Sequence, residues 1–271
     1  MADTVLCEVA DDGVALLTLN RPDRLNAWTY EMQLTLFDLL QSCADDERVR
    51  VIVVTGAGRG FCPGADMNDL SSLSSDDGAV DARANRTDTR PITFAMAIPK
   101  PVIAAINGAC AGLGLAFALT CDIRFCAENA KLTTAFSRRG LIAEHGTSWI
   151  LPRLVGPAHA LDLLISGRVF RGSEAAELGL VNRAVEDELV LDFALEYARD
   201  VAANVSPASM ATIKLQVYEA LSRPLIDALD HANLLMLESF SKPDFAEGVQ
   251  SFVEKRPPAF PALAAAASSP Q

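Results

Sequence analysis

Two short segments rich in glycine and alanine constrain the fold of this 271-residue chain more than any other feature. They read Phe-Cys-Pro-Gly-Ala-Asp at residues 61–66 and Asn-Gly-Ala-Cys-Ala-Gly-Leu-Gly at residues 107–114. Each follows an apolar, β-branched run typical of a buried strand, at residues 51–55 and 101–106. The second segment continues into residues 115–119, a short apolar run that predicts a helix. We therefore expect two tight turns whose backbone is left uncovered by side chains.

Uncovered backbone in such turns has chemical consequences. N–H groups that are freed in a turn and backed by a helix N-terminus can point at developing negative charge. Two donors that converge from separate loops form an oxyanion hole, which often contributes the largest single effect in acyl-group chemistry. Either segment alone is better explained by an ordinary strand-to-helix turn, so the functional interpretation depends on the pair.

The composition indicates an acidic globular protein with a substantial core. The formal net charge is −12, which argues against a nucleic-acid partner, and 50% of the residues are hydrophobic. The six cysteines show no Cys-x-x-Cys pair and no metal-ligand spacing, so reduced thiols and no metal site are expected. The N-terminus lacks the features of a signal peptide, and no apolar run is long enough to span a bilayer. We expect a soluble cytoplasmic protein without a membrane partner.

Residue spacing excludes several other catalytic patterns. The glycine-rich run at residues 56–60 fails the dinucleotide-binding pattern because its third glycine would fall at Phe61. The sequence has no Gly-x-Ser-x-Gly nucleophile elbow, and its three histidines have no ligand-like spacing.

Alternating periodicities predict an α/β architecture followed by a helical region. The expected strands are residues 6–9, 14–20, 49–55, 101–106 and 123–126, the first two forming a hairpin. The expected helices are residues 29–43, 91–98, 115–119, 210–221 and 225–240. Residues 71–88 are polar and predict a mobile loop or a frayed helix. Strands that alternate with helices favour parallel pairing, and the apolar faces of the two C-terminal helices need a docking partner.

The two glycine segments together resemble those of the crotonase superfamily, the enoyl-CoA hydratase/isomerase family. Residues 21–27 look like the family's first coenzyme A loop, and residues 121–124 look like the strand after its central helix. Residues 241–258 look like its C-terminal signature. The resemblance extends from about residue 5 to about residue 260. It implies an α/β fold, a crotonase-type spiral of repeated ββα units with a C-terminal helical trimerisation region.

The family's architecture implies three regions in this chain. Residues 1–205 would form the spiral core with the acyl-CoA site. Residues 206–260 would form a helical oligomerisation region that builds homotrimers, commonly paired into hexamers. Residues 261–271, which are rich in alanine, would form a disordered tail.

The resemblance also implies substrate-binding positions. Ala65 and Leu113 align with the two residues whose backbone N–H groups bind the thioester oxygen in the family. Arg24 stands where the family places a basic residue near the coenzyme A phosphates, and the alternative is a solvated surface arginine. The remaining candidates are Asp66, Met67 and Asn68 for the adenine or pantetheine path, and Lys255 for a phosphate in its own or another subunit.

The acid and base positions decide which reaction the resemblance implies. Typical family hydratases use two glutamates, and the aligned positions here hold Ala116 and Phe136, which cannot transfer a proton. Related enoyl-CoA isomerases carry a single acidic base at the position of Glu144. Two alternatives remain at this point: Glu144 caps a helix that starts near Gly146, or His145 is the base.

The resulting expectation is an acyl-CoA enzyme that shifts a double bond from Δ3 to Δ2. The Ala65 and Leu113 N–H groups would stabilise the enolate, and Glu144 would be the base. Coenzyme A is then part of the substrate, and no separate cofactor is expected. Two other functions remain open, a 2-enoyl-CoA hydratase in which Glu144 alone handles the water, and a catalytically inactive acyl-CoA-binding protein.

Overall fold

The structure, a computed structural model, describes residues 3–66 and 88–263. The site candidates Met67 and Asn68 lie outside the described residues, as does all but the last residue of the polar segment 71–88. The predicted tail also lies outside them, apart from residues 261–263.

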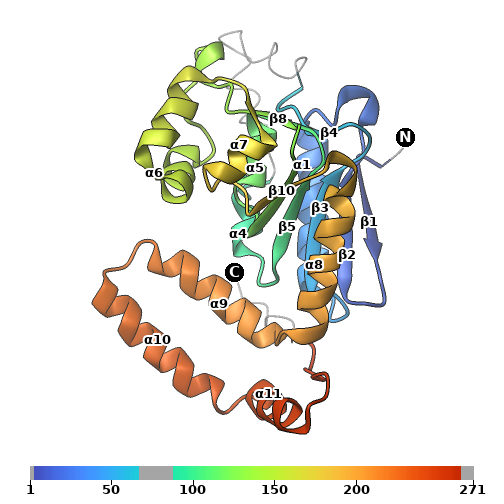
Figure 1. The fold of residues 1–271 in the computed structure, drawn as a ribbon, viewed down its shortest axis with the longest axis vertical. Coiled ribbons are helices and arrows are strands. Elements are labelled where there is room, and N and C mark those ends of the chain that lie inside the picture. Colours follow the sequence, from blue (N-terminus) through green and yellow to red (C-terminus); the bar gives the residue numbers. More distant parts are fainter. Residues whose placement is uncertain (1–2, 67–87, 264–271) are drawn as a thin grey trace.

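The core is built on a six-stranded sheet with the strand order β1-β2-β3-β5-β7-β10 (Figure 1). Its strands are β1 (Val5–Val9), β2 (Val14–Leu19), β3 (Val51–Gly56), β5 (Val102–Ile106), β7 (Ile123–Ala127) and β10 (Arg183–Val185). β1 and β2 pair antiparallel, and every later pair of neighbours is parallel. The predicted hairpin and the predicted parallel pairing are therefore confirmed.

A second sheet of four short strands has the order β4-β6-β8-β9. Its strands are β4 (Gly60–Cys62), β6 (Ala109–Ala111), β8 (Lys131–Thr133) and β9 (Phe170–Arg171). β4, β6 and β8 pair in parallel, and along the chain they follow β3, β5 and β7 in turn. The chain thus visits both sheets before it enters a helix, which is the predicted repetition of ββα units.

The central strands are buried on both faces. Ile52 and Val54 of β3 pack in one apolar core, which also contains Phe37 of helix α1 (Tyr30–Asp45). Their neighbours Val51 and Val53 point to the other face and pack in a second core under helix α8 (Val190–Asn204). Because both faces exclude water, such a strand requires a continuous apolar run rather than an alternating one.

The remaining helices complete the spiral and the C-terminal region. They are α4 (Phe94–Ala97), α5 (Leu113–Ala118), α6 (Thr147–Ser166), α7 (Gly172–Glu177), α9 (Pro207–Ala220), α10 (Leu225–Ser239) and α11 (Pro243–Glu254). Short 3-10 turns occupy Pro22–Arg24, Ser137–Arg139 and Asp187–Leu189. Within the described residues, no helix is long and apolar enough to cross a membrane.

The sequence predicts no helix at α7, α8 or α11, and for α6 it predicts only a start near Gly146. In α6, Pro152 and Pro157 flank Gly156, whose φ of 77° and ψ of 161° interrupt the helix, so one periodic pattern never forms. In α8, the buried stripe contains Ala194, Ala198 and Ala202, four residues apart. Alanine is only weakly apolar, so this spacing does not predict a buried helix face from the sequence. The alanines are buried because α8 packs closely against the sheet.

A buried ionic cluster fastens α9 to the core. The Lys214 ammonium lies 2.7 Å from the Asp122 carboxylate and also donates to the backbone carbonyls of Ala95 and Lys100. The Tyr218 hydroxyl donates to the same carboxylate at 2.8 Å. Burial lowers the pKa of Lys214 and raises that of Tyr218. The cluster therefore joins α9 to the start of the central strands and to α4.

Replacing Asp122 by alanine should lower the free energy of unfolding by about 3–5 kcal/mol, because the buried Lys214 charge would lose its partner. Denaturant unfolding at fixed protein concentration measures the change. The matched control is Arg223→Ala, which removes the partly exposed ion pair with Glu219 at the end of the same helix and should cost under about 1 kcal/mol. Equal costs for both variants would contradict the assignment of a buried anchor.

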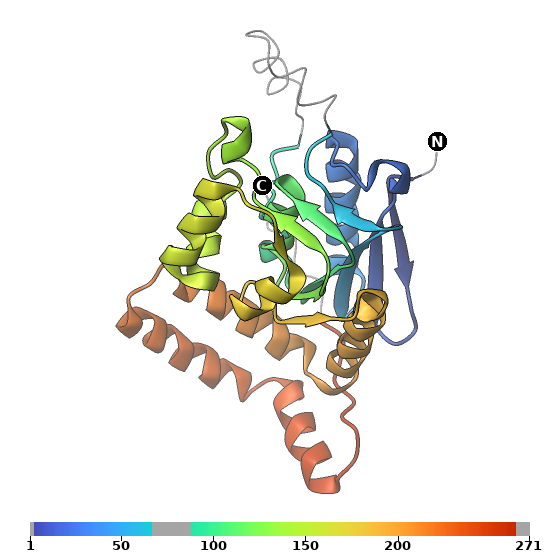
Figure 2. The ribbon, with the colours of Figure 1, turned by 45° about the horizontal axis from the view of Figure 1, so that its top comes forward.

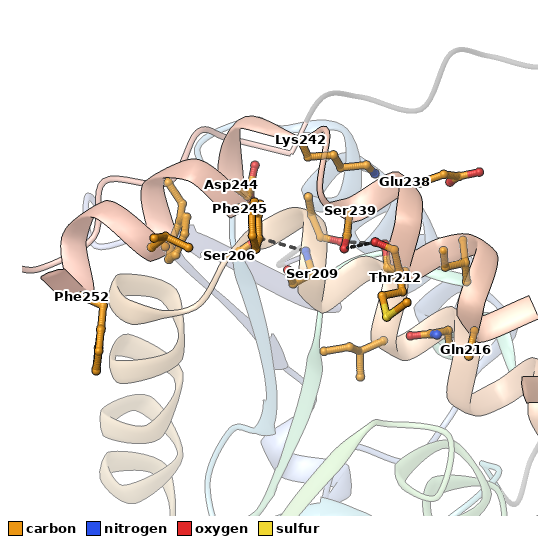
Figure 3. A pocket seen from close by; sticks show the side chains of 18 of the residues that line it. Ser206, Ser209, Thr212, Gln216, Glu238, Ser239, Lys242, Asp244, Phe245 and Phe252 are labelled. Atoms are coloured by element: carbon orange, nitrogen blue, oxygen red, sulfur yellow. Dashed lines mark hydrogen bonds between the residues drawn. The ribbon is translucent and has the colours of Figure 1, made fainter.

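Helices α10 and α11 extend away from the sheets (Figures 1 and 2), and no residue of α10 is buried. With α9 they enclose a largely apolar groove of about 640 Å³, whose walls include Thr212 and Gln216 of α9 and Phe245 and Phe252 of α11 (Figure 3). The most exposed apolar side chains on these three helices are Ile213, Leu225, Ile226, Leu234, Leu237, Phe252 and Val253.

Candidate active site

The two glycine turns predicted from the sequence meet in the structure. Gly64 has a φ of 105°, and Gly112 has a φ of 48° with a ψ of −118°, conformations that favour glycine. A Cβ atom on Gly64 would lie 3.1 Å from the Ala111 carbonyl oxygen and 3.6 Å from the Leu113 nitrogen. The turns are packed backbone against backbone, so glycine is required both for the local conformation and for the close approach.

The Ala65 amide is oriented by a short parallel bridge to Trp28. The Trp28 N–H donates to the Gly64 carbonyl and the Asp66 N–H donates to the Trp28 carbonyl, both at 2.8 Å. In extended chain successive N–H groups alternate in direction, so the Ala65 N–H points away from Trp28. Within the described residues it donates no hydrogen bond.

The Leu113 amide is the first N–H of helix α5. Gly112 is the N-cap residue, and a helix gives no internal acceptor to the N–H groups of its first turn. Gly114 lies directly against β4, since a Cβ there would come within 2.3 Å of the Cys62 carbonyl oxygen. The start of α5 is thereby held beside the segment that carries Ala65, and the Leu113 N–H also donates no hydrogen bond within the described part of the chain.

The first loop, at residues 21–27, is tied to this turn by side chains that the sequence analysis did not single out. Arg21 forms an ion pair with Asp66 at 3.0 Å and also donates to the Ala27 carbonyl. Asn26 is fully buried, accepts from the Arg21 N–H, and donates to the carbonyls of Ala57 and Gly60. The available sequence signal for Asn26 was an asparagine inside a charged loop, a residue type that tolerates the positive φ of 65° that it adopts here.

Asp66 was expected along the adenine or pantetheine path. Its carboxylate is paired with Arg21, and only 13% of the side chain is exposed. The side chain therefore fixes the loop beside the turn, and a substrate contact through this residue stays a prediction.

Arg24 is exposed on the turn Pro22–Arg24. Within residues 3–66 and 88–263 its guanidinium has no ion pair or side-chain hydrogen bond, so it is available to an anion there. Lys255, the other cationic candidate, follows α11 with a φ of 55°. α11 lies at the lower end of the protomer in Figure 1, whereas α5 lies in the core beside the sheets, so Lys255, which follows α11, is not brought to the Ala65 and Leu113 amides within this chain.

Glu144 lies in the loop before α6, and its side chain is 35% exposed. The N-cap residue of α6 is Gly146, and no side chain makes a capping hydrogen bond there. The part of Glu144 that contacts the helix is its backbone carbonyl, which accepts from the N–H and the hydroxyl of Thr147 at 3.0 and 2.7 Å. The capping alternative for the Glu144 side chain is therefore wrong. Its carboxylate instead faces the His145 ring, 3.8 Å from Nε2.

The two positions that carry glutamates in typical hydratases are apolar and buried here. Ala116 is fully buried and Phe136 is 5% exposed, and both belong to the main apolar core. The same core holds Trp28 and Phe117, whose ring centroids are 5.4 Å apart. These four buried side chains exclude water, and none of them can carry a proton. Within the described residues, no cluster of three or more His, Cys, Asp or Glu side chains could hold a metal ion.

Comparisons with known proteins agree over nearly the whole chain. A family model described as enoyl-CoA hydratase/isomerase matches residues 10–262. The 1,2-epoxyphenylacetyl-CoA isomerase of Escherichia coli (strain K12) is 36% identical over 261 residues, which cover 96% of this chain and 99% of that protein. The crystal structure of a probable enoyl-CoA hydratase/isomerase from Mycobacterium abscessus has a TM-score of 0.84 at 35% identity and covers 96% of this chain and 99% of that chain.

A third similar protein has a higher sequence identity. The crystal structure of an enoyl-CoA hydratase from Mycobacterium marinum is 49% identical, with a TM-score of 0.69, and the match covers 82% of this chain and 100% of that chain. The fold implied by the family resemblance is confirmed by these structures.

Proposed function

This chain belongs to the enoyl-CoA hydratase/isomerase family, and we propose that it moves the double bond of an enoyl-CoA thioester from Δ3 to Δ2. It is an enzyme of the hydratase/isomerase type. In the proposed reaction the thioester oxygen accepts hydrogen bonds from the Ala65 and Leu113 N–H groups. Glu144 removes a proton from the α-carbon, the hole stabilises the enolate, and Glu144 returns the proton to the γ-carbon.

The observation that carries this proposal is the pairing of two uncovered amides with a neighbourhood that lacks the hydratase glutamates. Isomerisation and hydration both need a site that stabilises the enolate anion, and the oxyanion hole supplies it. Hydration in addition needs a positioned water and a second proton carrier. Ala116 and Phe136 supply neither, whereas a double-bond shift needs one base that works on two carbons.

Two alternatives are retained, and the first is supported by relatives that are named enoyl-CoA hydratases. One is 2-enoyl-CoA hydration with Glu144 alone handling the water, and the other is a catalytically inactive acyl-CoA-binding protein. Turnover assays on matched 3-enoyl- and 2-enoyl-CoA thioesters separate the three functions. Conversion of the 3-enoyl thioester to its 2-enoyl isomer without a 3-hydroxyacyl product supports isomerisation. A 3-hydroxyacyl product supports hydration, and binding without turnover supports the inactive protein.

The proposed coenzyme A contact is tested at Arg24. Arg24→Ala should weaken acyl-CoA binding by about 10- to 100-fold, the value of a hydrogen bond to a charged group, and should reduce its salt dependence. Titration calorimetry at two salt concentrations measures both effects. The control is Arg48→Ala, because Arg48 is an exposed arginine whose ion pair is with the neighbouring Asp46. Unchanged affinity in Arg24→Ala would overturn the phosphate assignment.

We also propose that the chain assembles as a homotrimer or a dimer of trimers in the cytoplasm. The exposed apolar side chains of α9, α10 and α11 and the groove between these helices support this assembly, because a lone protomer would leave them in water. Light scattering at micromolar concentration should give three or six times the mass of one chain. A stable monomer would contradict this assembly. Lys255 could then not contact a ligand bound to another subunit.

A further inference from the structure

Two of the six cysteines meet across a boundary between helix and sheet. Cys7 lies on β1 between Val5 and Val9, and in a strand these three side chains share one face. Val5 and Val9 pack against the core that contains α1, so Cys7 also faces that helix. Cys43 lies in the last turns of α1 with its side chain buried.

The two thiols differ in access to solvent, although they are neighbours. Cys7 is exposed, whereas Cys43 is 3% exposed. Burial raises the pKa of the Cys43 thiol to about 12, and the neighbouring Cys7 thiol adds to this rise. The end of α1 is fixed at this point, because the Lys100 ammonium donates to the carbonyls of Cys43 and Asp46 at 2.8 and 2.6 Å.

We propose that Cys7 and Cys43 form a reversible redox site that responds to a small peroxide. Cys7 is the thiol that meets the oxidant, and Cys43 is the thiol that resolves it. The proposal is independent of the reaction assigned to the active site, since neither thiol belongs to the turns that carry Ala65 and Leu113.

The reaction balances with hydrogen peroxide as the oxidant. The Cys7 thiolate attacks one peroxide oxygen, the O–O bond breaks, and the released hydroxide takes a proton to give water and a Cys7 sulfenic acid. The Cys43 sulfur then attacks the Cys7 sulfur, and the S–S bond forms as the S–O bond breaks. The second water leaves with the Cys43 proton. Two thiols lose two electrons in total, and one peroxide becomes two waters.

The other cysteines of the described residues offer an internal comparison. Cys62 and Cys110 occupy paired positions on β4 and β6, but both are fully buried. Cys121 and Cys126 are buried in the same core. An oxidant in water reaches none of these four thiols without local opening, so the Cys7–Cys43 pair should react first.

The test uses the full chain, reduced and then treated with a small excess of hydrogen peroxide, quenched with catalase, and alkylated after unfolding. The parent should lose two of its six alkylatable thiols, and peptide mapping should find the Cys7 peptide joined to the Cys43 peptide. Dithiothreitol should restore all six. Cys110→Ala should still form the cross-link, which shows that an unrelated core substitution does not affect it.

Two further variants separate the roles of the thiols. Cys43→Ala should leave a Cys7 sulfenic acid that dimedone traps, and Cys7→Ala should keep all five remaining thiols at the same dose. The proposal is overturned if Cys7 in the parent ends as a sulfinic acid or as a disulfide between two chains while Cys43 stays alkylatable. It is equally overturned if a buried core pair reacts before Cys7. Because the parent alone gives the cross-link readout, the test stands even where a variant folds poorly.

Discussion

Replacing Glu144 by glutamine should lower kcat on the 3-enoyl thioester by about 100- to 10,000-fold, the usual cost of removing a general base. Glutamine keeps the size of the side chain but cannot carry the proton from the α-carbon to the γ-carbon. Acyl-CoA affinity should change little, because the thioester oxygen is assigned to backbone amides. The melting temperature should also hold, since the Glu144 side chain makes no capping hydrogen bond to α6. Steady-state kinetics and thermal melting measure the two effects on one preparation.

His145 is the matched control for this result. Its ring lies 3.8 Å from the Glu144 carboxylate, so it is the nearest alternative base in the described loop. His145 has a φ of 54°, and asparagine tolerates this left-handed region, so His145→Asn preserves the backbone. We expect a modest effect on kcat in this variant. A large loss in His145→Asn together with near-parental turnover in Glu144→Gln would reverse the assignment of the base.

Replacing Gly64 by alanine should lower kcat by about 100- to 1000-fold, the cost of losing one donor of an oxyanion hole. The new Cβ would meet the Ala111 carbonyl oxygen at 3.1 Å in a conformation that L side chains rarely adopt. The segment must then shift, and with it the Ala65 N–H. The oxyanion hole needs the Ala65 and Leu113 N–H groups close enough to donate to the same oxygen. A shift of the Ala65 N–H should therefore lower kcat more than substrate affinity. Single-turnover kinetics with saturating thioester isolates this step.

Gly179→Ala is the control for backbone strain alone. Gly179 has a φ of 75°, but a Cβ there would approach only the Leu154 carbonyl oxygen, at 3.9 Å. Both variants should lose stability through strain, whereas only Gly64→Ala should lose turnover. If Gly64→Ala retains kcat within a few-fold of the parent, the Ala65 amide does not contact the reacting oxygen.

The sequence by itself determined the features that depend on local geometry. β3 and β5 could be predicted because a strand buried on both faces needs an uninterrupted apolar run. α1 could be predicted because its buried residues recur with the spacing of a helix, and the turns at Gly64 and Gly112 because a side chain would be strained there. Family resemblance added the meaning of the Ala65 and Leu113 amides, which side-chain chemistry could not have indicated.

Only the tertiary structure decided the contacts between distant segments. Arg21 and Asp66 are 45 positions apart, and Lys214 and Asp122 are 92 apart, so no local pattern pairs them. The sequence also left open that Glu144 caps α6, and the observed backbone course leaves its carboxylate beside His145 instead. α8 escaped prediction because its alanines become a buried stripe only under the sheet. In each case the contacts of the residue depend on how whole helices and strands pack together, and the local sequence does not specify that packing.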